Sequence, residues 1–120
     1  MAEGEAIRRE PPALVVELRS VLGAKLVAYI AGVDETRTVS AWAEGVYVPT
    51  SETTEVLRMA YRIVRRMEQS AGGPAIAAWF QGMNPLLEDR SPARVLRESM
   101  DHSGRDHLDV LAAAESWVAG

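Results

Sequence analysis

The chain contains no cysteine, so it can form neither a disulfide framework nor a thiolate metal site. Aromatic residues are also scarce, at 6% of the chain. No apolar run approaches the roughly 20 residues that a membrane-spanning helix needs. The first residues carry charges and a Pro-Pro pair but no apolar stretch typical of a secretory signal. These absences predict a cytoplasmic protein that has no membrane partner.

An excess of positive charge is missing too. The chain has 13 Lys and Arg against 17 Asp and Glu, which gives a net charge of −4. Proteins dedicated to nucleic acids usually carry a strong basic footprint. Any binding to DNA would therefore need a local patch or an oligomer.

Residue patterns typical of enzymes are absent as well. His102 and His107 are five positions apart instead of the four of a helical metal pair, and no suitably spaced acid joins them. Gly72-Gly73 lacks the lysine and the spacing of a phosphate-binding loop. No nucleophile and base can be grouped from their spacing. The sequence therefore predicts a protein that is not an enzyme and that needs no metal or cofactor.

What is present is apolar periodicity near 3.6 residues, in a chain that is 48% apolar and 25% charged. This pattern predicts an all-α fold, a compact helical bundle with a helix-turn-helix-like N-terminal half and a helical C-terminal half. Residues 1–12 are expected to form a flexible arm. Helices are predicted at residues 13–22, 24–31, 37–44, 52–70, 75–81, 92–100 and 106–118.

Residues 13–70 form the predicted helix-turn-helix-like region. Between Leu26 and Gly45 a short helix, a glycine-containing turn and a second short helix follow one another, and Thr36 is a candidate cap for the second helix. The candidate DNA-binding residues on that helix are Arg37, Thr38 and Ser40. Two interpretations remain open: a helix that reads DNA, or a structural helix that reads no sequence.

The long helix predicted at residues 52–70 carries arginines on one side, within about 100° for a helix of 3.6 residues per turn. They form either a basic stripe for phosphate or an acidic partner, or a solvated face with local pairs such as Glu55 with Arg58. The arginines are Arg58, Arg62, Arg65 and Arg66.

Residues 71–120 contain the least ordinary stretch. Trp79 and Phe80 are adjacent, and the Asn84-Pro85 step must interrupt the helix because a residue before proline avoids the helical conformation. Leu86-Leu87 is expected to turn back into the core, and Ser91-Pro92 predicts a new helix start. The last helix is apolar on more than one side, which suggests contacts on more than one side. Its Trp117, like Trp79 and Phe80, is either core or an anchor for a partner.

The pattern Trp79…Asn84-Pro85-x-Leu87…Pro92-x-x-x-Leu96 resembles the C-terminal toxin-binding domain of the Xre/MbcA/ParS family of antitoxins. The segment Val39-x-x-Trp42-x-x-Gly45 resembles the helix-turn-helix part of the same proteins. Together the resemblance covers about residues 14–120, and the short MbcA-like members are the most similar.

This resemblance implies an antitoxin of a type II toxin-antitoxin system. Its partner would be a RES-domain toxin that degrades NAD⁺, neutralised when the antitoxin covers the active site. The resemblance also implies a homodimer, higher hetero-oligomers with the toxin, and repression of its own operon through operator DNA. The expected toxin-binding residues are Trp79, Phe80, Asn84, Pro85, Leu87, Arg94, Trp117, Val118 and Gly120.

Two departures from the family pattern bear on DNA binding. The turn between the two short helices is one residue longer than usual, and Ala41 stands where relatives often carry a basic residue. The alternative function is a helix-turn-helix transcriptional regulator whose C-terminal half serves dimerisation.

Overall fold

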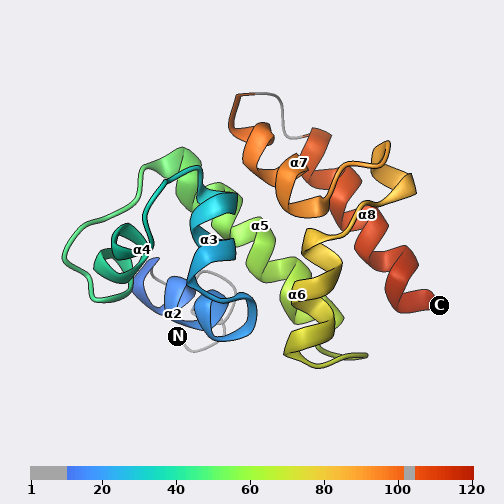
Figure 1. Cartoon of the computed structure of the whole chain (residues 1–120), viewed down its shortest axis with the longest axis horizontal. Coiled ribbons are helices and arrows are strands. Elements are labelled where there is room, and N and C mark those ends of the chain that lie inside the picture. Colours follow the sequence, from blue (N-terminus) through green and yellow to red (C-terminus); the bar gives the residue numbers. More distant parts are fainter. Residues whose placement is uncertain (1–10, 102–104) are drawn as a thin grey trace, which may run out of the picture.

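The computed structural model describes residues 11–101 and 105–120. Within these ranges the chain is helical and has no β-strand, so the predicted all-α class is confirmed. Figure 1 shows the arrangement, with α2 to α4 in one half and α6 to α8 in the other. The elements are α2 (Pro11–Leu22), α3 (Ala24–Ala31), α4 (Thr36–Ala43), α5 (Ser51–Met67), α6 (Gly73–Gln81), the 3-10 turn η1 (Pro85–Leu87), α7 (Pro92–Glu98), the 3-10 turn η2 (Ser99–Asp101) and α8 (Arg105–Ala119).

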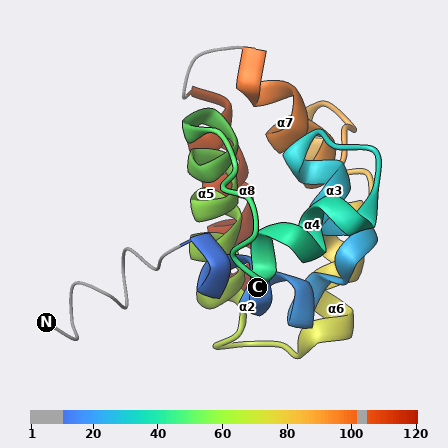
Figure 2. The same cartoon turned by 90° about the vertical axis from the view of Figure 1, so that its left-hand side faces the viewer.

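The long helix α5 connects the two halves, since it packs against α2, α3, α7 and α8. Figure 2 shows α5 and α8 along one side of the molecule and α3, α4, α6 and α7 along the other. Thr50 caps α5, because its side-chain oxygen accepts a hydrogen bond from the Thr53 N–H at 3.2 Å. The apolar side of α5 faces the core, and its members Val56, Met59, Ala60, Ile63, Val64 and Met67 are all buried.

The first three helices follow the prediction closely. Helix α3 has the predicted bounds and ends at Gly32, whose φ of 78° is left-handed. Helix α4 buries Val39 and Trp42. The prediction that Thr36 caps α4 is wrong: Glu35 occupies the cap position without a side-chain bond, and Thr36 is the first helical residue.

The C-terminal helices are also built from local signals in the sequence. Ser91 caps α7, since its hydroxyl oxygen accepts a hydrogen bond from the Arg94 N–H at 3.0 Å. Helix α8 packs against α5 and α7. It buries Val110, Ala113 and Ala114 in the common core.

Several predicted boundaries need correction. Pro11 and Pro12 belong to α2, so the arm cannot extend to residue 12; its residues 1–10 lie outside the described part of the chain. The fourth predicted helix ends at Met67 and not at residue 70. His102 also lies outside the described residues. Among the described helices, none combines the length and apolar character needed to cross a membrane.

Candidate partner-binding surfaces

The turn between α6 and α7 is organised by Asn84. Its side-chain Oδ1 accepts a hydrogen bond from the Leu86 N–H at 2.9 Å. Its backbone oxygen accepts from the N–H groups of both Leu87 and Asp89, each at 2.9 Å, and its own N–H donates to the Arg90 oxygen at 3.2 Å. Asn84 therefore fixes the shape of the turn, and Pro85 opens η1 directly after it.

The turn closes through two consecutive residues in the left-handed conformation, Glu88 with φ 60° and Asp89 with φ 66°. Neither is glycine. A left-handed conformation costs a residue such as Glu88 roughly 1–2 kcal/mol, whereas aspartate adopts it more readily. The hydrogen bonds to Asn84 offset this strain. Backbone strain that persists in a native structure collects at functional sites, so this turn is a candidate site.

Two adjacent leucines in the turn point in different directions. Leu87 is 2% exposed and anchors η1 in the core, whereas Leu86 is 63% exposed. The prediction that both return to the core is therefore wrong for Leu86, because successive residues of a 3-10 helix lie about 120° apart. Met83, just before Asn84, is 81% exposed.

The aromatic pair that precedes the turn is mainly structural. Phe80 is fully buried, and its ring meets the ring of half-buried Trp79 edge to face, with centroids 5.2 Å apart. Phe80 and Leu87 were expected to bind the toxin. Because both side chains are buried, neither is available to contact a partner on the folded chain.

Ion pairs join the turn to α7. Arg90 lies 3.7 Å from Glu88 and 3.6 Å from Glu98. Arg94, an expected toxin-binding residue, is exposed and donates a hydrogen bond from Nε to Glu98 at 2.8 Å. The hydrogen bond to Glu98 and the charge of Glu98 raise the pKa of Arg94 above its ordinary value.

The last helix presents apolar residues to solvent as well as to the core. Trp117 is 36% exposed, and Leu108, on another face, is 64% exposed. Val118 is half-buried, and Gly120 is exposed at the end of the chain. Helix α8 packs against α5, α7 and η1, while the apolar side chain of Leu108 faces solvent.

Sequence reasoning did not select Met83, Leu86 and Leu108, although they are among the most exposed large apolar residues of the C-terminal half. Apolar residues are assigned to the core by default. For Met83 and Leu86, the one indication in the sequence was their position on either side of the Asn84-Pro85 step.

The candidate DNA-binding residues lie on α4. The Arg37 side chain is 85% exposed and pairs with Glu35 at 3.2 Å. Thr38 is half-buried, and Ser40 accepts a hydrogen bond from Arg19 of α2 at 3.5 Å. These residues share an open hollow of about 630 Å³ with the exposed Val46 and Tyr47. Of the three candidates, Arg37 is the one whose side chain stands fully in solvent.

The arginines of α5 do not form one uniform stripe. Arg66 binds Glu115 of α8 through Nε, at 2.9 and 3.0 Å from the two carboxylate oxygens. Arg65 lies over the Tyr61 ring at 6.0 Å. The Nε atom of Arg58 is buried without a hydrogen-bond partner. Arg66 is therefore bound within the chain, so fewer arginines of α5 are available to bind a phosphate.

One pair of residues resembles catalytic machinery. The Ser99 hydroxyl donates to the Leu96 oxygen at 2.6 Å, so it must accept from Nε2–H of His107, which is 2.9 Å away. An activated serine needs a histidine that takes its proton. Here the histidine donates to the serine instead, so the pair has a structural role. Within residues 11–101 and 105–120, no three His, Cys, Asp or Glu side chains are grouped to hold a metal ion.

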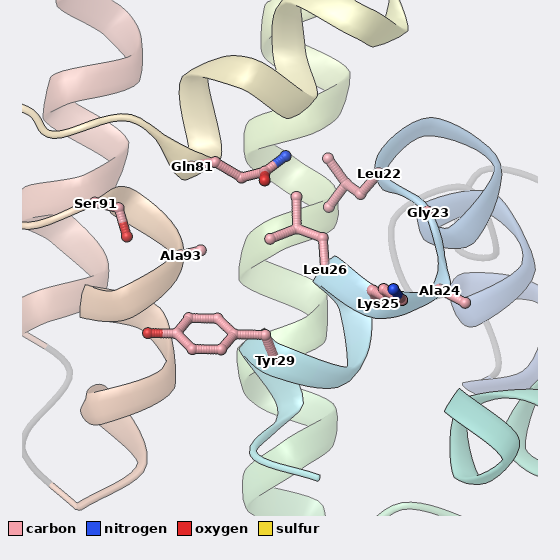
Figure 3. A pocket seen from close by; sticks show the side chains of 9 residues that line it. All are labelled: Leu22, Gly23, Ala24, Lys25, Leu26, Tyr29, Gln81, Ser91 and Ala93. Carbon is pink, nitrogen blue, oxygen red and sulfur yellow. The ribbon is translucent and has the colours of Figure 1, made fainter. Parts of the chain in front are cut away.

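An open pocket of about 570 Å³ lies between α3, the end of α6 and the start of α7. Figure 3 shows Gln81 and Leu22 along the upper edge of the pocket, Ser91 and Ala93 at its left, and Tyr29 reaching from α3 toward α7. The Tyr29 ring is covered by the guanidinium of Arg97, 4.8 Å from the ring centroid. The same arginine donates to the Tyr29 oxygen of the backbone at 2.7 Å. The pocket contains one lysine, Lys25, and no acidic residue.

The overall fold has a counterpart among solved structures. A chain in the crystal structure of the M. tuberculosis MbcT-MbcA toxin-antitoxin complex superposes with a TM-score of 0.71, and the match covers 91% of this chain and 94% of that one. The two chains share one fold. At 22% identity the likeness concerns the fold alone, and it confirms the fold that the sequence resemblance implied. No protein-family model and no curated protein sequence matches the chain.

Proposed function

We propose that this chain is the antitoxin of a toxin-antitoxin pair and binds its toxin through the C-terminal half. The observation that carries the proposal is the fold shared with a chain of a toxin-antitoxin complex over nearly the whole length. The Asn84-Pro85 motif adds to it, because the structure places this motif in a strained turn with exposed apolar residues around it. Exposed apolar surface that persists on a folded chain is typical of interaction sites.

The proposed mechanism needs no catalysis by this chain. The toxin is a RES-domain protein that degrades NAD⁺, and the antitoxin inhibits it by covering the active site. When free antitoxin is about 100-fold above the dissociation constant, roughly 99% of the toxin is occupied. Loss of the antitoxin then restores the toxin activity without any chemical switch.

The contact surface is proposed to comprise the expected residues that are at least partly exposed. Residues of α6, of the turn and of α7 form one part, and the end of α8 forms the other. Phe80 and Leu87 support this surface from the core. The proposed contact residues are Trp79, Asn84, Pro85, Arg94, Trp117, Val118 and Gly120.

A second part of the proposal concerns assembly and DNA. The chain dimerises, forms larger complexes with the toxin and represses its own operon, with Arg37 as the main residue that reaches the operator. The favouring observation is the exposure of Arg37 at the first turn of α4. Replacement of Arg37 by Ala should abolish a gel shift with operator DNA and leave inhibition of the toxin unchanged. A gel shift without any toxin binding would favour a transcriptional regulator instead.

The decisive experiment is co-expression with the protein encoded by the adjoining reading frame. The chain should rescue growth and stop the loss of NAD⁺ caused by that protein. Absence of rescue, with both proteins produced in soluble form, would refute the antitoxin function. Deletion of residues 117–120 tests the site: inhibition that persists at full strength would exclude the end of α8 from the contact.

A further inference from the structure

The turn that Asn84 organises displays two large apolar side chains at its surface. Met83 is 81% exposed and Leu86 is 63% exposed, although Leu87, the residue directly after Leu86, is held in the core. The turn packs against α8, which carries the exposed Leu108. A rigid backbone therefore presents Met83 and Leu86 to solvent without the loss of entropy that ordering a flexible loop would require.

The charges beside these side chains are negative. The Glu88 side chain is 88% exposed, and Asp89, also exposed, has no ion pair with a described residue. The nearest cation of the turn, Arg90, is 30% exposed and is shared between Glu88 and Glu98. The outer rim of the turn is thus acidic, while its tip is apolar.

We infer that this turn inserts Met83 and Leu86 into an apolar hollow of the partner, and that lysine or arginine residues line the rim of that hollow. The inference rests on the proposed function, because the partner is the toxin. Its basis is the combination of apolar tip, acidic rim and rigid backbone. Anchors of this kind supply much of the binding energy of an interface, whereas charges at the rim mainly govern the rate of association.

The apolar part is tested with the purified chain and the protein encoded by the adjoining reading frame, with affinity measured by calorimetry. Leu86→Asp and, separately, Met83→Ser should each weaken binding at least tenfold. Both side chains are exposed, so the melting temperatures should stay close to that of the original chain. The matched control is Val48→Asp, a residue 75% exposed in the loop before α5, which should bind like the original chain.

The acidic part is tested with the double variant Glu88→Gln and Asp89→Asn. Asparagine tolerates the left-handed conformation, so the turn keeps its shape. Association should slow severalfold, and its dependence on salt should become weaker. Glu55→Gln, at an exposed position of α5, is the control and should leave the association rate unchanged.

The outcomes separate the two levels of the argument. If the original chain does not bind the neighbouring protein, the proposed function and this inference both fall. If the original chain binds while Leu86→Asp and Met83→Ser retain its affinity, the antitoxin function stands and the inserted turn is refuted. If the variant with Glu88→Gln and Asp89→Asn associates as fast as the original chain, the proposed lysine or arginine residues at the rim of the partner's hollow are refuted.

Discussion

The imidazole of His107 and the hydroxyl of Ser99 are joined by a hydrogen bond of 2.9 Å that ties the first turns of α8 to η2. Because Ser99 donates its own proton to Leu96, the histidine must be the donor. This bond holds the start of the last helix against the end of α7 across the residues between them.

Replacement of Ser99 by Ala should therefore destabilise the chain. Both hydrogen bonds are lost, and the expected cost is about 1 kcal/mol for a buried hydroxyl. Chemical denaturation monitored by circular dichroism measures the change. Ser20→Ala is the control, since the Ser20 hydroxyl makes a bond of the same kind to Glu17 at an exposed site. Equal losses for both variants would contradict a special role for Ser99.

Gly32 offers a second test of the fold. Its φ is 78°, and a Cβ atom there would lie 2.9 Å from the Cε atom of Met100. The end of the Met100 side chain can move, but the backbone conformation remains unfavourable. Gly32→Ala should cost roughly 1–2 kcal/mol. At Gly73 in α6 the corresponding Cβ would meet only ordinary contacts, so Gly73→Ala should leave stability unchanged or raise it.

Phe80 and Trp117 should separate stability from binding. Phe80 is fully buried, and Phe80→Ala should lower the free energy of unfolding by about 3–5 kcal/mol. Trp117 is partly exposed, so Trp117→Ala should reduce binding of the proposed toxin partner more than it reduces stability. Thermal melts and calorimetric titration of the same samples provide both measurements. A Phe80→Ala protein that melts normally and fails to bind would reverse the assignment.

The pair of Arg66 and Glu115 should contribute little on its own. Their side chains are 36% and 47% exposed. A double-mutant cycle with alanine should give a coupling of about 0.2–1 kcal/mol that decreases as salt is added. Arg62, exposed on the same helix, provides the reference substitution. A coupling that is insensitive to salt would show that the two helices depend on this pair more strongly than its exposure implies.

Local signals explain why most helices were predicted correctly. Ser91-Pro92, Thr50 and Gly32 each act within one helical turn, so their effect is visible in the sequence. The exposure of Leu86 depends instead on how η1 lies against α8, and this packing leaves no periodic pattern. The same holds for the hydrogen bond between Ser99 and His107, because it joins η2 to α8 and no local signal in the sequence predicts this contact. The helix-breaking residues Asn84-Pro85 and Ser91-Pro92 thus located the proposed site in the sequence. Which of its side chains face outward could be identified only from the fold.

The burial of Val110, Ala113 and Ala114 has a consequence for turnover. It ties α8 to the same core as α5, so a protease cannot cut the buried turns of α8 until that core opens. Amide hydrogens on the buried side of α8 should accordingly exchange with deuterium at rates close to those of α5. The lifetime of the chain in the absence of its partner would then be set by opening of the whole bundle, and not by fraying of its last helix.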